Sequence, residues 1–299
     1  MRRGAIAAAL CVALAACSVV SRPQVGGTGP APPSATVADR GGPQPAVAEA
    51  EAERIARRYL EVAGEADLRR DQRLLAQVEG GTALAVHSAL YRILPRPGRI
   101  PGDVTDRFLI PKFTGYPRWF VAEGRGHAAV FVRRSPGAPW LVRHRVTLQG
   151  PLPRVKRDRD GYAVQPREVP DPAVDHAQLI TRGGCGDLCT ALRRHHRLFA
   201  GARWRARVQI RPGQERYALR TADGGSLVWY FLDHSFTAVR GEGGHPVTME
   251  QEAARMLGVA ELTRRMDWRS SYQAVAHAGR GRTLWLGLEL PGWVSVTGR

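Results

Sequence analysis

The sequence predicts an α+β protein of two modules, each with helices first and a curved antiparallel sheet afterwards. Two patterns support this: apolar residues at helical spacing early in each half, and alternating apolar and polar residues later. A segment rich in proline and charge separates the two halves. With 299 residues, of which 43% are hydrophobic, the chain is long enough to bury a sizeable core.

The amino terminus has the pattern of an exported protein. Two arginines precede the apolar stretch AIAAALCVA, which is shorter than the about 20 residues of a membrane-spanning helix. The segment LAAC, ending at Cys17, resembles the bacterial lipobox, in which small residues precede a cysteine that is lipidated before cleavage. We therefore expect residues 1–16 to be a lipoprotein signal peptide and Cys17 to be the lipidated first residue. A buried N-terminal helix containing two cysteines is the alternative.

Residues 17–45 are predicted to be a flexible tether. The segment is rich in Pro, Gly, Ser and Ala and has no apolar periodicity. Because a bacterial lipoprotein carries two or three acyl chains, its attachment is more stable than that of a single chain. We expect the protein to be lipid-anchored on the extracytoplasmic side of the cell membrane.

The chain is strongly basic, with a net charge of +17 from 44 Lys and Arg against 27 Asp and Glu. A basic surface attracts anions such as lipid head groups and wall phosphates. Arginine is spread along the chain instead of being clustered in a tail or on one helix, which together with export argues against nucleic acid as a partner. The codon bias of a GC-rich genome is the alternative explanation of the charge.

The N-terminal module is predicted over residues 46–150. A first amphipathic helix is expected over 46–66, Asp71 is expected to cap a second, short one, and Thr82 a third. Strands should follow around Phe108, Trp119 and Val130. The last strand should bury one face, which carries Trp140, Val142, His144, Val146 and Leu148.

Residues 151–172 are expected to be a linker, and residues 173–299 the C-terminal module. A helix is expected over 187–199, and the spacing of Thr248 and Gln251 predicts a capping box before a second helix. The strands of this module are expected over 204–210, 217–219, 227–239, 271–278, 283–290 and 293–297, with a hairpin turn at 221–225.

Two cysteines remain in the globular part, Cys185 and Cys189. In an exported protein such a pair is expected to form a disulfide. A metal site with His195 and His196 is one alternative, although adjacent histidines point to different sides. Free thiols are the other alternative.

The sequence contains no familiar catalytic motif, such as G-x-S-x-G, H-E-x-x-H or a P-loop. Asp233, His234 and Ser235 have the residue types of a catalytic triad, but on a strand His234 faces away from the other two. We expect His234 and His144 to be core histidines. The sequence therefore predicts no catalytic residue, no metal and no cofactor.

The best candidate for binding is a series of arginines that alternates with apolar residues on one strand: Arg203, Arg205, Arg207 and Arg211. Guanidiniums in a row on one face can hold phosphates or carboxylates. The alternative is an outer sheet face that is only solvated.

Three segments resemble a family of actinobacterial lipoproteins that is described by a domain of unknown function. They are residues 56–84, GYPRWF at 115–120 and TADGGSLVWY at 221–230. The resemblance covers most of residues 46–299 and implies an envelope location, without implying an activity. The first half is also similar, in element order, to the cone of the nuclear transport factor two and cystatin-like folds.

These observations predict a lipid-anchored envelope protein with a binding or scaffolding role. Its partner would be an anionic wall or lipid component or an envelope protein. The alternative is an extracytoplasmic enzyme, a hydrolase or isomerase with a pocket in one cone. A lipoprotein that captures solutes for a transporter is disfavoured because no pair of α/β domains is predicted.

Overall fold

The computed structural model describes residues 42–94, 105–182, 197–279, 281–289 and 292–299. These residues all belong to the second of two compact units, 41–299. The expected signal peptide, Cys17 and nearly all of the tether lie outside the described residues, as do Cys185, Cys189, His195 and His196. The predicted disulfide and its alternatives therefore stay predictions.

Three helices open the described part of the chain: α1 (Glu49–Arg69), α2 (Gln72–Leu75) and α3 (Gly81–Ile93). The Asp71 carboxylate accepts hydrogen bonds from the backbone N–H groups of Arg73 and Leu74, at 2.8 and 3.0 Å, which confirms the predicted cap of α2. The predicted cap at Thr82 is wrong. The N-cap of α3 is Gly80, which has no side chain, and Thr82 already lies inside the helix.

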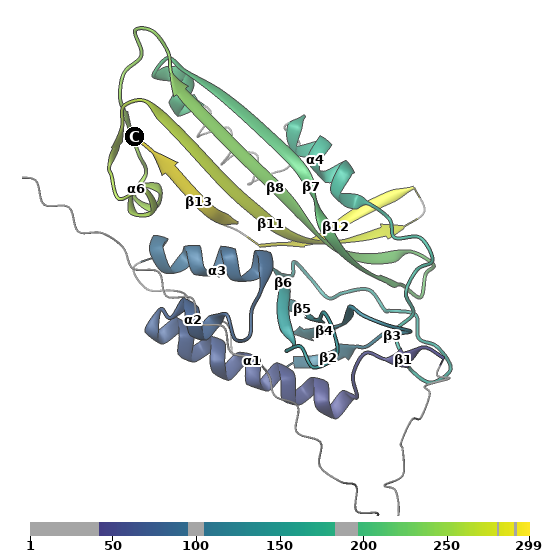
Figure 1. Ribbon diagram of the computed structural model, residues 1–299. Coiled ribbons are helices and arrows are strands. Elements are labelled where there is room, and N and C mark those ends of the chain that lie inside the picture. The colour runs from purple at the N-terminus through teal and green to yellow at the C-terminus, as the bar shows by residue number, and fades with distance from the viewer. Residues whose placement is uncertain (1–41, 95–104, 183–196, 280, 290–291) are drawn as a thin grey trace, which may run out of the picture. The chain divides into compact units, whose positions relative to one another are not determined.

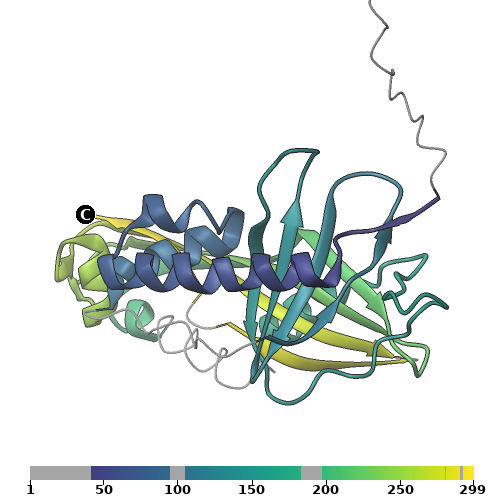
Figure 2. The same cartoon turned by 90° about the horizontal axis from the view of Figure 1, so that it is seen from below.

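The first sheet is antiparallel, in the order β2-β4-β5-β6. Its strands are Thr105–Leu109, Arg118–Gly124, His127–Arg133 and Leu141–Thr147. A short pair, β1 (Gln44–Pro45) and β3 (Lys112–Phe113), lies beside it. Helix α1 crosses these strands (Figure 2) and packs on one face of the sheet, where Tyr59 meets the edge of Phe131 at a ring distance of 5.6 Å.

A β-bulge in β6 changes which side chains face which core. Phe131 pairs with Val142 and Val130 pairs with His144, so Arg143 is an extra residue on β6. Consequently Val142 joins the core under α1, whereas His144 and Val146 point to the opposite side. The predicted placement of Trp140 to Leu148 on one face is therefore wrong: the alternation is interrupted at Arg143.

The second sheet is larger, with the order β12-β11-β8-β7, and β13 pairs with the same edge of β11 as β12. Its strands are β7 (Trp204–Arg220), β8 (Ser226–Arg240), β11 (Arg265–Gly279), β12 (Arg282–Leu288) and β13 (Trp293–Gly298). The predicted strands are found here, and β7 and β11 run longer than expected.

The remaining elements of this half are short. Helix α4 (Pro172–Thr181) packs beside β7 and β8. Helix α6 (Gln251–Leu257) lies in the chain between β9 (Val247–Thr248) and β10 (Glu261–Leu262), which pair with each other. The predicted capping box is wrong, because Thr248 lies in β9 and the N-cap of α6 is Glu250. Most of the helix predicted over 187–199 lies outside the described residues.

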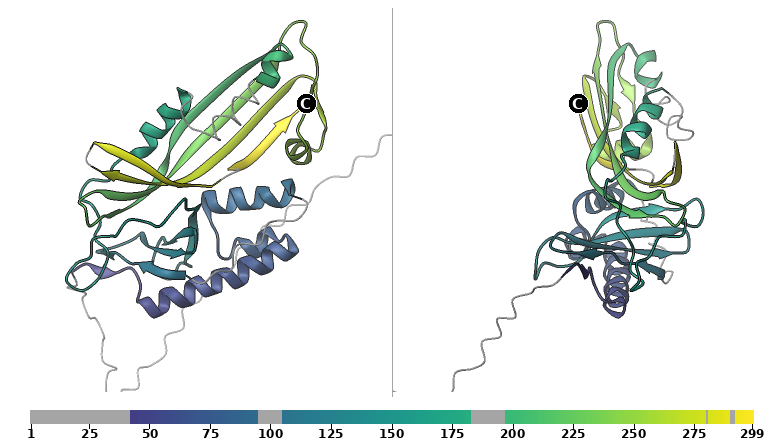
Figure 3. Two further views of the ribbon diagram at one scale, coloured as in Figure 1. Left: turned by 180° about the vertical axis from the view of Figure 1, so that it is seen from behind. Right: turned by 90° about the vertical axis from the view of Figure 1, so that its right-hand side faces the viewer.

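The two sheets pack on each other. The first sheet lies between α1 and the long sheet (Figures 1 and 3), and the core between the sheets contains Val121, Val130, Trp229, Phe231 and Val275. Leu152 and Ala163, from the predicted linker, are buried in the same core. The α+β class with antiparallel sheets is thus confirmed, while the module boundaries and the cone likeness stay predictions.

Candidate anion-binding face

One face of the long sheet is polar where β7, β8, β11 and β13 lie side by side, and most of it is exposed, although Ser271 at its end is buried. Residues that pair directly across neighbouring strands share a face of the sheet. The register therefore builds rows across the strands. We call the face formed by these rows the basic face; it consists of Arg205, Val239 and Arg265; Arg207, Thr237, Asp267 and Thr297; Gln209, Ser235, Arg269 and Ser295; and Arg211, Asp233 and Ser271.

The charge of the basic face is positive. It has the arginines 205, 207, 211, 265 and 269 against two aspartates, Asp233 and Asp267, and all five arginines are exposed. Arg265 is neutralised by Asp267, with Nε and Nη2 at 2.6 and 2.8 Å from the carboxylate. Hydrogen bonds from Arg265, which outweigh the effect of desolvation, lower the pKa of Asp267. Asp267 is therefore an anion at neutral pH.

Several guanidiniums of the face are open to a ligand. Within the part of the chain that the structure describes, no side chain forms a hydrogen bond or salt bridge with Arg205 or Arg269. The amide of Gln209 lies within hydrogen-bonding distance of Arg207 and Arg211. The Gln209 amide oxygen can accept a hydrogen bond from one of these two guanidiniums at a time, and because the amide is neutral it leaves their charge uncancelled.

A groove of about 550 Å³ crosses the basic face over β8, β11 and β13. Its polar lining comes from adjacent rows of the face and consists of Ser235, Thr237, Arg265, Asp267, Arg269, Ser295 and Thr297. Thr237 donates its hydroxyl to Asp267 at 2.9 Å, which fixes the centre of the groove. The groove thus combines guanidinium, hydroxyl and carboxylate groups.

The structure separates the four arginines predicted as one row. Arg205, Arg207 and Arg211 lie on the basic face, but Arg203 lies in the turn before β7, in the left-handed conformation with φ of 58°. Sequence reasoning missed Arg265 and Arg269 because their strand was predicted to begin only at Ser271. The alternation of Arg265, Asp267 and Arg269 with Met266 and Trp268 is the signal that reveals their common face.

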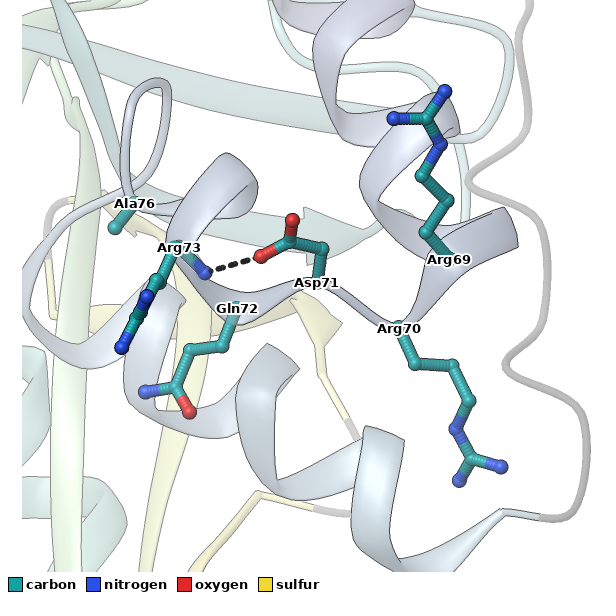
Figure 4. Close-up of a pocket in the computed structure, with 6 residues that line it drawn as sticks. All are labelled: Arg69, Arg70, Asp71, Gln72, Arg73 and Ala76. Atoms are coloured by element: carbon teal, nitrogen blue, oxygen red, sulfur yellow. Dashed lines mark hydrogen bonds between the residues drawn. The ribbon is translucent and has the colours of Figure 1, made fainter.

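A second basic pocket lies at the corner between α1 and α2, lined by Arg69, Arg70, Asp71, Gln72, Arg73 and Ala76 (Figure 4). Most of its charge is already engaged. Arg69 pairs with Glu65 at 2.8 Å, and Arg70 donates to the backbone carbonyls of Tyr91 and Leu94. Because Arg70 connects the end of α1 to the end of α3, we regard the pocket as structural.

The first half of the chain also contains a buried ionic cluster. The imidazole of His87 lies between two carboxylates, with Nε2 2.8 Å from Asp67 and Nδ1 3.0 Å from Glu79. Tyr91 donates its hydroxyl to Asp67 and Tyr59 donates its hydroxyl to Glu79, both at 2.8 Å. The side chains of His87, Asp67 and Glu79 are only 3%, 4% and 1% exposed, which leaves no access for a substrate.

The cluster is charged. Burial alone lowers the pKa of His87, but its hydrogen bonds to Asp67 and Glu79 outweigh burial and raise that pKa above the ordinary value. Burial also raises the pKa of Glu79, yet the hydrogen bond and charge of His87, with the charge of Arg145, lower it overall. His87 is therefore best described as an imidazolium that donates both N–H groups to carboxylates.

Arg145 connects this cluster to the second half of the chain. Its guanidinium lies 3.9 Å from Glu79 and 3.6 Å from Glu289, which follows β12. Its backbone N–H donates to the buried side chain of Gln273 on β11, at 2.8 Å. The positive charge of Arg145 thus faces Glu79 from the helical segment and Glu289 from the long sheet's side of the molecule.

The histidines with triad-like neighbours lack the geometry for nucleophilic catalysis. His234 is buried against Trp268 and Tyr272, while Asp233 is exposed and accepts a hydrogen bond from Ser271, as the alternation predicts. His277 faces Thr221 and Asp223 through the same ring atom, Nε2, at 3.2 and 3.3 Å. A triad requires the hydroxyl and the carboxylate on different ring nitrogens.

Comparison with known proteins identifies the family. A domain of unknown function, DUF8094, matches residues 43–188. The chain is 30% identical to an uncharacterized lipoprotein of Streptomyces coelicolor over 236 aligned residues, and the match covers 66% of this chain and 70% of that protein. It is 28% identical to an uncharacterized lipoprotein of Streptomyces avermitilis over 277 aligned residues, and this match covers 79% of this chain and 81% of that protein. The chain belongs to this family of actinobacterial lipoproteins.

Membership of the lipoprotein family confirms the predicted resemblance. The DUF8094 match covers the first sheet, its helices and α4, and ends before the basic face begins at β7. The two Streptomyces lipoproteins bring no activity or ligand. No solved structure matches the chain significantly. In the described part of the chain, no helix is both long and apolar enough to cross a membrane.

Proposed function

We propose that this lipoprotein is anchored at the outer face of the cell membrane by the lipid on Cys17 and binds an anionic component of the envelope through its basic face. The role is binding, without catalysis. Family membership supports the anchor, together with the lipobox-like pattern before Cys17. The exposed arginines support the ligand class.

The observation that carries this proposal is the register of the basic face. Arg205, Arg207 and Arg211 lie at one edge, and Arg265 and Arg269 lie two strands away. Between them, β8 contributes the hydroxyls of Thr237 and Ser235 to the face, together with Val239 and Asp233. Such an array attracts polyanions, because the positive charges add to one electrostatic field. Each guanidinium can then form charge-assisted hydrogen bonds with the bound anion. Its two aspartates leave a clear excess of positive charge.

The position of the acid–base side chains supports binding over the enzymatic alternative. His87, Asp67 and Glu79 are buried and bonded to one another. Glu123, on β4, accepts a hydrogen bond from Arg107 at 2.7 Å. These contacts give the groups structural roles.

The proposal is tested by removing charge from the face. The triple variant Arg205→Gln, Arg207→Gln and Arg211→Gln should bind isolated cell-wall material or anionic vesicles at least about tenfold more weakly than wild type, equivalent to about 1.4 kcal/mol. Cosedimentation of the full-length protein measures this. Binding should also weaken with added salt.

The matched control removes the same charge from helix α1, through Arg54→Gln, Arg57→Gln and Arg58→Gln. This control should bind within about twofold of wild type, on the same scale. An equal loss in both variants would show that net charge alone governs binding, and it would contradict a role for the basic face.

A further inference from the structure

We infer that the groove over β8, β11 and β13 is a subsite for the phosphate group of a polyol-phosphate polymer of the envelope. This inference rests on the proposed function, in which the basic face binds envelope anions. It adds the chemical class of the ligand and the side chains that read it.

Arg269 is the centre of the subsite. It pairs directly with Ser235 on β8 and with Ser295 on β13, so a guanidinium lies between two hydroxyl groups in one row. A phosphodiester presents two non-bridging oxygens, which match the fork of a guanidinium and accept further hydrogen bonds from hydroxyls. Because Arg269 has no hydrogen-bond or salt-bridge partner among the described residues, its fork is available.

The neighbouring row supplies complementary groups. Asp267 pairs directly with Thr237 and Thr297, so a carboxylate lies between two hydroxyls. This row lies two residues from the Arg269 row, or about 7 Å along the strands. A carboxylate repels phosphate but accepts hydrogen bonds from alcohols. Alternating rows of this kind match a chain that alternates phosphate groups with hydroxyl-bearing carbons.

The face favours such a polymer over a lipid surface. Proteins that bind at a bilayer surface insert bulky apolar side chains beside their cationic groups. Among the described residues of the basic face, Val239 is the one large aliphatic side chain that is exposed, at 36%. The groove itself is lined by seven polar residues and by Phe236 and Trp268, which are both buried. Its exposed lining is therefore polar and suits a hydrated polymer.

The test uses the full-length mature lipoprotein in detergent and immobilised polyglycerol phosphate as the probe. Arg269→Gln should weaken binding at least about tenfold, and Ser235→Ala with Ser295→Ala about threefold. Asp267→Asn should strengthen binding about threefold, because it removes the repulsion of phosphate. The control Arg58→Gln, which removes one exposed charge from α1, should leave binding unchanged.

Two further surfaces separate the ligand classes: phosphate-free polyglycerol and vesicles that contain phosphatidylglycerol. Binding of wild type to polyglycerol phosphate, with loss in Arg269→Gln and none on polyglycerol, supports the subsite. Equal binding of Arg269→Gln and wild type would overturn it. Binding to vesicles alone, or to wall material but not to polyglycerol phosphate, would also overturn it and leave the proposed function standing. Absence of binding to any anionic surface would overturn both.

Discussion

Nε2 of His87 on α3 lies 2.8 Å from a carboxylate oxygen of Asp67 on α1, and both side chains are almost completely buried. With Glu79 and Arg145 the cluster sets two carboxylates against two cations, and Arg145 also faces Glu289. Loss of one member leaves uncompensated charge in the core. Breaking a buried ion pair in this way is far more costly than replacing the whole pair.

His87→Leu is therefore expected to lower the free energy of unfolding by about 3–5 kcal/mol. The variant leaves Asp67 and Glu79 without their shared cation. Denaturant titration followed by Trp fluorescence measures the change. Ser88→Ala, at the next position on α3, is the control and should change stability by less than about 1 kcal/mol. Comparable losses in both variants would argue against an ionic role for His87.

The same cluster predicts a dependence of stability on alkaline pH. Since the pKa of His87 is raised above 6.5 in the folded state, its contribution is fully present below pH 6.5 and is lost as pH rises through the folded value. Wild type should lose stability as the pH rises above 6.5, whereas His87→Leu should lose less on the same alkaline titration. Parallel curves for the two proteins would disprove the assignment of an imidazolium.

His144 is expected to make the folded state less stable as the pH falls. Burial lowers the pKa of His144 to about 4, so the folded protein resists protonation that the unfolded chain accepts. At about 1.36 kcal/mol for each pKa unit, this site should cost about 3 kcal/mol of stability between pH 6.5 and 4. His144→Leu should flatten this acid limb by that amount. An unchanged slope would show that His144 is protonated in the folded state.

Two glycines allow a matched test of how backbone conformation and the space around the Cα position affect stability. Gly81 has φ of +56°, and a Cβ there would lie 2.5 Å from the guanidinium carbon of Arg143. Gly81→Ala should destabilise the protein by about 2 kcal/mol or more, through strain and the displaced arginine. Gly64 in α1 has open space around it, so Gly64→Ala should stabilise by about 0.5–1 kcal/mol. Thermal unfolding of both variants checks the opposite signs.

Membrane retention should depend on Cys17. Cys17→Ala removes the thiol that carries the lipid. The protein should then either leave the membrane fraction or keep its uncleaved signal peptide. Fractionation of cells and mass spectrometry of the mature N-terminus follow this change. Cys11→Ala, inside the predicted signal peptide, should leave retention intact. A cleaved Cys17→Ala protein that stays firmly on the membrane would refute the lipid anchor.

Local patterns predicted much of the fold, because they depend on neighbouring residues. The helix over α1, the Asp71 cap and most strands follow from spacing and turn chemistry alone. The caps at Thr82 and Thr248 failed because nearby residues supplied another start to each helix. The bulge at Arg143 has no local sequence signal, since it is set by how β6 meets two different partners.

The candidate site was predictable only in part for the same reason. Arg205, Arg207 and Arg211 alternate on one strand, so their common face can be read from the sequence. Arg265 and Arg269 join them through pairing with β8, which brings together residues about 60 positions apart. The His87 cluster is likewise assembled from α1, α3 and the segment before α3, and no single stretch reveals it.

Because of the bulge at Arg143, β6 packs on both sides: Val142 contacts the core under α1, and His144 contacts the long sheet. The halves of this protein are consequently not interchangeable parts. Consider a recombinant that joins the first half of one relative to the second half of another. Its β6 would need the right number of residues, and its first half would also have to fit the side chains at Trp229 and Phe231, on which it packs. Divergence within the family is therefore expected to change these positions together.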